Sequence, residues 1–330
     1  MARQKVTLLD VAQHAGVSKW TASRAFTEGA SISPSAKEKV LKAAYSLGYR
    51  PNLLARSLTT KRTNLIGLVV DELQNPYIFH VLDLLMERLQ RQGMLSVVLN
   101  ISAQDSYQRT IELAEQFQVD GLVFLGTSMD ASIQRLIRHD PGLPCIALFR
   151  TACEEGVPYL STDDLSATRS MAHELIAQGK RRFAYLAGPA STTSVLRREE
   201  GYLSVLAEYG LTFDQRWSVD HYHRLGAYES IKESLASLVN PWDVLLCEND
   251  ILAIGALDAL HEQGMKDVAV IGFDDIDLAA SPQYALTTYQ QPTEQILDRA
   301  IAYLLSGEIG PVSELFAGQW VYRRSHNPRA

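Results

Sequence analysis

Short apolar runs separated by stretches of helical length recur along residues 63–330, and this alternation constrains the fold more than any other feature of the chain. The runs form a first series at residues 65–70, 95–99, 122–125 and 145–148 and a second series at residues 183–187, 244–247 and 268–272. Strands that alternate with helices predict parallel sheets with helices on both faces. Two series predict an α/β body of two lobes, in which a ligand binds in the cleft at the carboxyl ends of the strands.

Polar and aromatic side chains follow several of these runs, which makes them candidates for the cleft. In chain order they are Asp71, Asn75, Tyr77, Phe149, Arg150, Arg198, Asn249, Asp250, Asp274, Asp275 and Gln291. An Arg, an Asn, carboxylates and an aromatic ring suit a polyol, because they offer paired hydrogen bonds to hydroxyls and a flat face to the ring. Asp250 precedes an apolar helix, so we expect it to cap that helix rather than to bind a ligand.

The charged residues are unevenly distributed along the chain. Residues 1–62 hold 11 Lys and Arg against 3 Asp and Glu, whereas the other 268 residues hold 20 basic and 35 acidic ones. A polyanion attracts the first segment and repels the second. We therefore expect only the first segment to contact nucleic acid.

Residues 1–49 carry the start and stop signals of three short helices. These starts and stops are, in order, Thr7 and Gly16, Ser18 and about Thr27, and Ser33 and Gly48. Small polar residues cap helix N-termini, the Pro after Ser33 suits a first helical position, and Gly suits the position after a helix. Two helices joined by a turn of about three residues that contains Gly have the spacing of a helix-turn-helix.

The second of these helices has two different faces. At about 100° per residue, Ala22, Ala25 and Phe26 cluster on one side, which therefore packs on the other helices. Trp20 and Arg24 fall on the opposite side. Because the core side is already filled, we interpret these two as DNA-facing side chains. The alternative is that Trp20 belongs to the core and Arg24 is an ordinary surface charge.

Residues 50–62 combine a Pro, several leucines and basic residues in a short amphipathic segment. A helix of this length is poorly stable alone in water. We interpret the segment as a hinge that becomes ordered only when something holds it. The alternative is an ordinary flexible linker.

The first segment resembles the DNA-binding head of the LacI/GalR family of bacterial repressors. The resemblance rests on VTLLDVAQHAGVSKWTASRAF and YRPNLLARSL, and it continues through LIGLVVDELQNPY, VDGLVFLG, VLRREEGY, CENDILAIGALDAL and VAVIGFDD. It implies an all-α helix-turn-helix head at residues 1–49, a hinge at residues 50–62 and an effector-binding and dimerisation body at residues 63–330. The implied body is periplasmic-binding-protein-like, with two lobes joined by crossovers near residues 160–165 and 287–293.

The resemblance also implies which residues bind DNA. Lys19, Trp20 and Arg24 correspond to positions that read bases in the major groove, where Arg24 would take a guanine through O6 and N7. Leu58 corresponds to the hinge leucine that wedges into the minor groove. Further contacts are implied for Thr7, Ser18, Thr21, Ser23, Asn52, Ala55 and Arg56. Because two heads are needed, the implied complex is a homodimer on a pseudo-palindromic double-stranded operator.

The effector site implied by the resemblance lies among the cleft candidates. It comprises Asp71, Asn75, Tyr77, Phe149, Arg150, Arg198, His221, Tyr222, Asn249, Asp274 and Gln291, with either His221 or Tyr222 at a family position for an aromatic residue. Phe149 stands where the family often has an Asp that helps to hold sugars, which weakens the case for a plain pentose. The expected effector is a sugar or sugar derivative. The alternatives are a purine or another non-sugar effector, or a co-repressor.

The resulting hypothesis is a ligand-responsive transcriptional repressor that is not an enzyme and uses no cofactor or metal. The sequence contains no GxGxxG, GxxxxGK, GxSxG or HExxH motif. A solute-binding protein of a transport system would suit the body but leaves the basic head without a role. An architectural DNA protein would not respond to small molecules.

Composition and the N-terminal segment predict a bacterial cytoplasmic protein, associated with the nucleoid when bound to DNA. MARQKVTLLDVAQ lacks the apolar stretch of a secretory signal, and no run approaches the roughly 20 apolar residues of a membrane span. Three cysteines without CxxC spacing suit a reducing compartment. Leucine heptads do not follow Ser325, so we expect no tetramer built on a helical tail.

Overall fold

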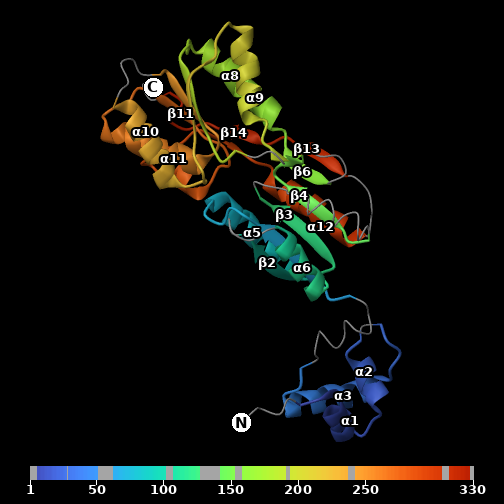
Figure 1. Cartoon of the computed structure of the whole chain (residues 1–330). Coiled ribbons are helices and arrows are strands. Elements are labelled where there is room, and N and C mark those ends of the chain that lie inside the picture. The colour runs from blue at the N-terminus through green and yellow to red at the C-terminus, as the bar shows by residue number, and fades with distance from the viewer. Residues whose placement is uncertain are drawn as a thin grey trace. The chain divides into compact units, whose positions relative to one another are not determined.

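The computed structural model describes residues 6–27, 29–50, 62–101, 107–126, 142–152, 158–190, 194–236, 242–306 and 312–327 (Figure 1). The chain divides into two compact units, residues 1–63 and residues 64–330. The first unit is all-α and the second is α/β with parallel sheets, which confirms the predicted fold class. Among the described helices, none is long and apolar enough to cross a membrane.

The first unit contains the three predicted helices. They are α1 (Leu8–Ala15), α2 (Lys19–Ala25) and α3 (Pro34–Leu47). The side chains of Thr7, Ser18 and Ser33 each accept a hydrogen bond from the backbone N–H three residues on, as the N-cap rule predicts. Gly16 and Gly48 end α1 and α3 with φ of 66° and 64°, a left-handed conformation that Gly adopts at no steric cost.

Helix α2 ends at Ala25, two residues before the predicted end near Thr27. The N–H groups of Phe26 and Thr27 donate to the carbonyls of Ser23 and Arg24, so the chain leaves the helix through a tightened turn of i→i−3 bonds. The sequence contains no Gly or Pro at this point to mark the stop.

Small residues fill the core of the first unit. Ala22 and Ala25 of α2 are buried in one cluster with Val11 and Val40. Their short side chains let the three helices approach closely. The opposite side of α2 is exposed, as predicted, and Trp20 there keeps 65% of its surface accessible.

The second unit contains two parallel sheets, one in each lobe. Their strand orders are β13-β6-β4-β3-β1-β2 in the first lobe and β11-β10-β7-β9 in the second. The first sheet consists of β1 (Leu65–Val70), β2 (Leu95–Asn100), β3 (Gly121–Leu125), β4 (Cys145–Leu148), β6 (Tyr159–Thr162) and β13 (Ser313–Phe316). The second sheet consists of β7 (Phe183–Ala187), β9 (Phe213–Ser218), β10 (Val244–Cys247) and β11 (Ala269–Ile271). Two antiparallel pairs lie outside them: β12 (Thr288–Gln290) with β14 (Gln319–Val321), and β5 (Thr151–Ala152) with β8 (Ser194–Val195).

Helices cover both faces of each sheet (Figure 1). In the first lobe they are α5 (Pro76–Arg91) and α12 (Thr293–Ser306) on one face and α6 (Tyr107–Phe117) on the other. In the second lobe they are α10 (Arg224–Leu235) and α11 (Asp250–Glu262) on one face and α8 (Asp164–Ala177) and α9 (Arg198–Glu208) on the other. A short 3-10 helix, η1, spans Asp277–Ala280. Successive residues of β10, Leu245 and Leu246, enter the cores on opposite faces, as the pleat of a strand dictates.

The described chain passes between the two lobes three times. The passages lie between β6 and α8, between β12 and α12, and between β13 and β14. After the third, Ser325 bonds to Val270 and Ala285 of the second lobe. The resemblance implies crossovers near residues 160–165 and 287–293, and the third passage was not predicted, because the short segments SELF and QWV carry no strand signal. Strand β9 was missed for a related reason, since FDQRWS is an edge strand with only every second residue partly buried.

The carboxylate of Asp250 connects distant segments of the chain through hydrogen bonds and does not form the predicted helix cap. Asn249 caps α11, because its Oδ1 accepts the N–H of Leu252. Asp250 is fully buried and accepts hydrogen bonds from the hydroxyl of Thr288 at 2.5 Å and the N–H of Ile276 at 2.9 Å. It thereby joins α11 to the chain on either side of η1. The prediction for Asp250 was wrong because two adjacent Asx residues compete for one cap, and only tertiary contacts decide between them.

The titration of Asp250 leads to a prediction about stability and pH. Burial raises the pKa of this carboxyl to about 6, from about 3.9 in an unfolded chain. The folded state holds the proton more tightly, so this group favours folding below pH 4 and the advantage is lost as the pH rises through about 6. Relative to Asp250→Asn, the wild type should lose about 2 to 3 kcal/mol of unfolding free energy over this interval. Urea unfolding at several pH values measures the difference, and Asp277→Asn, a substitution at an exposed position of η1, is the control.

Candidate functional site

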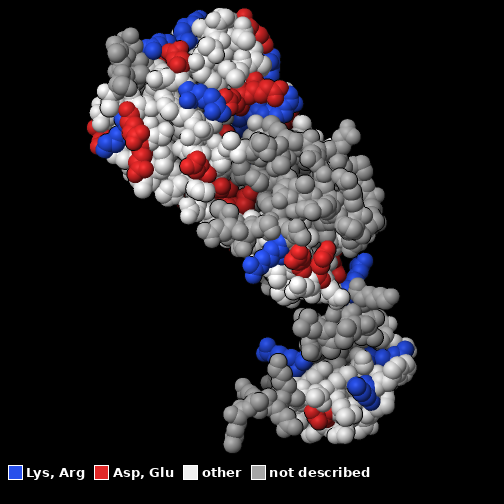
Figure 2. Space-filling view, in the orientation of Figure 1, with Lys and Arg blue, Asp and Glu red and all other residues white. Residues whose placement is uncertain are grey.

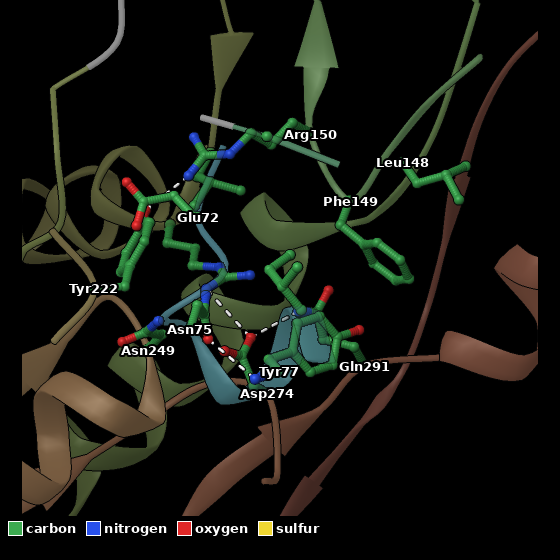
Figure 3. A pocket seen from close by; sticks show the side chains of 14 residues that line it. Glu72, Asn75, Tyr77, Leu148, Phe149, Arg150, Tyr222, Asn249, Asp274 and Gln291 are labelled. Carbon is green, nitrogen blue, oxygen red and sulfur yellow. Dashed lines mark hydrogen bonds and ion pairs between the residues drawn. The ribbon is translucent and has the colours of Figure 1, made fainter. Parts of the chain in front are cut away.

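A cavity of about 430 Å³, partly open to solvent, lies between the two lobes of the second unit (Figure 3). Nine of the predicted effector residues line it: Asn75, Tyr77, Phe149, Arg150, Arg198, Tyr222, Asn249, Asp274 and Gln291. The wall also includes Glu72, Ile78, Gly126, Leu148 and Leu196. The carboxyl ends of the strands therefore meet at one cavity, as the topology predicts.

Two aromatic rings form an apolar wall on the side of the first lobe. Tyr77 of α5 and Phe149 after β4 contact edge to face, with ring centroids 5.4 Å apart. The hydroxyl of Tyr77 is 2.9 Å from that of Thr293, so the ring is fixed at its far end. Phe149 has a φ of 62°, a left-handed conformation that is unfavourable for a bulky residue. Strain of this kind persists at ligand sites because the surrounding structure enforces it.

Arg198 is the centre of a buried charge cluster on the side of the second lobe. Its Nε donates to Oδ1 of Asp164 at 3.2 Å, and its Nη1 donates to the carbonyl of Glu248 at 2.6 Å. The same Nη1 lies 3.7 Å from Oδ1 of Asp274. The guanidinium carbon lies 3.6 Å from the ring centroid of Phe273. Two carboxylates and a carbonyl thus compensate one buried cation, as such a cation requires.

Asp274 is held in a fixed orientation next to Arg198. Its backbone has a φ of 121°, which non-glycine residues rarely adopt. Gln291 donates through Nε2 to Asp274 Oδ1 at 2.7 Å, while Gln291 Oε1 accepts the hydroxyl of Thr162 at 2.5 Å. Burial raises the pKa of the Asp274 carboxyl well above its ordinary value, and the Arg198 charge opposes this shift.

Two asparagines combine helix capping with a place on the cavity wall. Asn75 Oδ1 accepts the N–H of Tyr77 at 3.1 Å at the start of α5, and Asn249 Oδ1 accepts the N–H of Leu252 at 3.2 Å at the start of α11. Because each oxygen faces a backbone donor, the orientation of both amides is determined. The nitrogen of each amide remains as a hydrogen-bond donor for a ligand.

A chain of polar groups joins the two lobes across the cavity. Arg150 after β4 donates through Nη2 to the hydroxyl of Tyr222 at 2.7 Å. That hydroxyl in turn donates to Oε1 of Glu248. The ring of Tyr222 lies against Gly188, where a Cβ atom would approach it to 2.2 Å. Gly188 is therefore required for the ring to lie in the cavity.

Asp71 and His221, two of the predicted effector residues, do not line the cavity in the described structure. The Asp71 carboxylate lies behind Gly126, where a Cβ atom would approach it to 2.8 Å. The ring of His221 is 67% exposed, with Nδ1 3.7 Å from Oε1 of Glu72. Of the two alternatives for this loop, Tyr222 points inward and His221 outward. The pKa of Glu72 is raised by burial and by the neighbouring Asp71.

Three acidic residues of the cleft were missed from the sequence: Glu72, Asp164 and Glu248. Glu72 and Glu248 stand directly beside predicted residues, so the strand-end signal was present for both. Asp164 follows β6, a strand that was not predicted. A search for acidic residues after each predicted strand would have found Glu72 and Glu248 but not Asp164.

The predicted DNA-facing residues lie on the surface of the first unit. Lys19 and Trp20 are exposed and Arg24 is half-buried, and the charged side chains on the visible face of residues 6–50 are mainly basic (Figure 2). Thr7, Ser18 and Thr21 take part in the capping bonds of α1 and α2, and Ser23 is exposed on α2. The predicted hinge residues Asn52, Ala55, Arg56 and Leu58 lie outside the described residues.

Comparison with known proteins gives matches over both units. Residues 7–52 match the family model "Bacterial regulatory proteins, lacI family", and residues 63–310 match "Periplasmic binding proteins and sugar binding domain of LacI family". The HTH-type transcriptional repressor CytR of Escherichia coli (strain K12) is 30% identical over 305 residues, 91% of this chain and 89% of the relative. The ribose operon repressor of the same strain is 28% identical over 310 residues, 91% and 92% of the two chains.

Solved structures share the fold along almost the whole chain. The Lac repressor dimer bound to operator and the anti-inducer ONPF matches with a TM-score of 0.83 and 23% identity, over 98% of this chain and 99% of that one. The complex of the transcriptional regulator CelR with cellobiose matches with a TM-score of 0.69 and 26% identity, over 97% and 100%. The arrangement of a helical head and a two-lobed body is therefore common to all three proteins.

The buried position of Arg198 predicts a large cost for its removal. Arg198→Met should destabilise the second unit by about 3 to 5 kcal/mol, because Asp164 and Asp274 lose their counter-charge in a buried site. Arg216→Met is the matched control, since Arg216 forms an exposed ion pair with Glu199 at 2.6 Å and should cost at most about 1 kcal/mol. Urea unfolding followed by tryptophan fluorescence measures both costs. Equal costs for the two variants would contradict the role given to the cluster.

Proposed function

The chain belongs to the LacI family of bacterial regulatory proteins, whose members bind operator DNA and carry a sugar-binding effector domain. We therefore propose that a sugar derivative in the cavity between the lobes controls the affinity of this protein for a pseudo-palindromic operator. The single observation that carries the effector half of this proposal is the fixed Arg198–Asp274–Gln291 network on the cavity wall. The protein is on this proposal a repressor rather than an enzyme, located on the bacterial nucleoid when it is bound to DNA.

The chemistry of the cavity supports a ligand rich in hydroxyl groups. A hydroxyl both donates and accepts, so one sugar hydroxyl can donate to Asp274 while it accepts from Arg198. The amide nitrogens of Asn75 and Asn249 supply further donors at fixed positions. The wall of Tyr77 and Phe149 takes the apolar face of a sugar ring.

The position of Phe149 favours a sugar derivative, rather than a simple pentose, as the ligand. It places an apolar ring where a carboxylate would otherwise receive hydroxyl donors, so part of the ligand opposite Phe149 has no hydrogen bond to gain. A substituted or larger sugar can place an apolar group there. A purine or nucleoside is the competing ligand, because the same aromatic wall accepts a flat base.

Residues on both lobes contribute to the cavity, which gives a route from effector to operator. Asn75, Tyr77 and Arg150 come from the first lobe, whereas Arg198 and Asn249 come from the second. A ligand that bonds to both lobes stabilises one relative position of the lobes over another. This preference is coupled to DNA affinity by linkage, and its sign distinguishes an inducer from a co-repressor.

The DNA half of the proposal assigns base reading to α2. Trp20 and Arg24 lie on the face opposite the buried Ala22 and Ala25, and Lys19 is exposed at the start of the helix. Recognition helices of helix-turn-helix proteins enter the major groove with such a face. A homodimer presents two of these helices, so the operator repeats its half-site in inverted order.

Removal of one amide donor tests the effector site without loss of the helix cap. A thermal-shift screen of sugars, sugar phosphates, sugar acids, polyols, purines and nucleosides identifies the ligand, which at 100 times its Kd adds about 2.7 kcal/mol of stability. Asn249→Asp keeps the capping oxygen but replaces the donor, so we expect affinity to fall by about 10-fold or more. Asn100→Asp, at an exposed position of β2, is the control. Turnover of the ligand, or a loss of affinity equal in both variants, would contradict the proposal.

Removal of the guanidinium of Arg24 tests the operator contact. Arg24→Ala should cost about 1 to 3 kcal/mol of operator binding and relax the preference at one base pair of each half-site. Lys42→Ala on α3 is the control, because Lys42 is exposed and pairs with Glu38 in the same head. Binding to an operator selected from random DNA is measured at fixed salt. Unchanged affinity of the Arg24 variant would refute the assignment of α2.

A further inference from the structure

An exposed tryptophan on α2 stacks with an arginine one helical turn away. The guanidinium carbon of Arg24 lies 4.0 Å from the ring centroid of Trp20. The Trp20 side chain is 65% exposed, whereas Ala22 and Ala25 on the opposite side are buried. Residues four apart are neighbours on a helix surface, so the two side chains form one unit, the Trp–Arg stack.

The packing of the head does not account for Trp20. The core of the first unit is complete without this residue, and an indole that stays in water contributes little to folding. Among the described acidic residues of the head, Asp10 bonds to Thr7 and Glu38 pairs with Lys42, and neither pairs with Arg24. Among the described residues of the head, the indole ring is therefore the group that holds the guanidinium.

A stacked guanidinium keeps its hydrogen-bonding edge free. The guanidinium carbon lies over the indole ring, and a guanidinium that packs face to face with a ring keeps its N–H donors available, because they lie in its own plane. In the major groove a guanine offers O6 and N7, which accept two such donors at once. The stack also restricts a long side chain before DNA binds, which lowers the entropic cost of the base contact.

We propose that Trp20 is a positioning residue that sets operator specificity by holding Arg24 in the orientation that reads a guanine. The inference rests on the proposed role of α2 as the recognition helix. Trp20 then acts through Arg24 and not through a contact of its own with a thymine methyl group or the sugar-phosphate backbone. Without the ring, the guanidinium samples more orientations and discriminates less between guanine and adenine.

The test is a double-mutant cycle on the full-length protein. The wild type first selects its operator from random double-stranded DNA. Trp20→Leu removes the ring but keeps an apolar side chain, Arg24→Ala removes the guanidinium, and a fourth protein carries both changes. The affinity of each is measured for the operator and for a duplex in which the G·C pair read by Arg24 is replaced by A·T. The pair read by Arg24 is identified as the one whose replacement does not change the affinity of the Arg24→Ala variant.

A positioning role predicts a loss that depends on Arg24. Trp20→Leu should weaken operator binding by about 3- to 10-fold and reduce the preference for G·C by the same factor. In the Arg24→Ala background the same change should have an effect below about twofold, because the group it positions is gone. The slope of log K against log salt concentration should not change, since no phosphate contact is lost.

Two further variants separate positioning from other roles of the ring. Trp20→Tyr keeps an aromatic face and should retain most of the G·C preference. Tyr45→Leu removes the ring of an α3 residue that is 91% exposed, and it should change neither affinity nor preference. Circular dichroism and thermal unfolding establish that each head is folded. Equal losses from Trp20→Leu in both backgrounds, or a preference lost at a different base pair, would overturn the inference, because Trp20 would then contact DNA directly.

The experiment distinguishes failure of this inference from failure of the proposed function. If the wild type selects no sequence from the random pool, both are overturned. If it selects an operator that Arg24→Ala weakens and Trp20→Leu does not, only the positioning role of Trp20 is overturned.

Discussion

The buried guanidinium of Arg198 is the interaction on which the rest of the cavity depends. From the first position of α9 it reaches Asp164 at the start of α8, the carbonyl of Glu248 after β10 and Asp274 after β11. A buried cation requires counter-charges, and the buried carboxylates require the cation in turn. The starts of α8 and α9 and the ends of β10 and β11 are therefore fixed to one another, next to the ring of Phe273. Because these side chains are already fixed, ordering them adds little entropic cost when a ligand binds.

Most of the cavity could be predicted from the sequence, because its residues follow strands that are buried on both faces. Such strands appear as continuous apolar runs, and the polar residues directly after them, such as Asn249 and Asp274, are easily located. Asp164 was missed because β6 is a four-residue strand, YLST, without a periodic signal. The choice between His221 and Tyr222 was open because irregular loops have no periodicity that assigns a side chain to the inside. Contacts with Gly188 and Glu248, distant in sequence, decide it.

Local rules hold in the framework of the protein and are broken at the cavity. The N-caps of α1, α2 and α3 follow composition closely, and sequence analysis found all three. Phe149 and Asp274 instead have positive φ values, which composition does not predict for such residues. Asn75 and Asn249 lie between these cases, since they obey the capping rule and still offer a donor to the cavity. Sequence reasoning is therefore most reliable for the scaffold and least reliable where the scaffold has been adapted to bind.

The return of the chain to the first lobe affects the way the protein is made. The sheet of this lobe reaches β6 at Thr162, but α12, which covers one of its apolar faces together with α5, ends at Ser306, and the edge strand β13 ends at Phe316. At translation rates of about 5 to 20 residues per second, the partly covered sheet waits on the order of ten seconds for these elements. During that time an apolar face and an unpaired strand edge are open to association with other chains. The first lobe is thus the part of the nascent protein on which a chaperone has both the time and the surface to act.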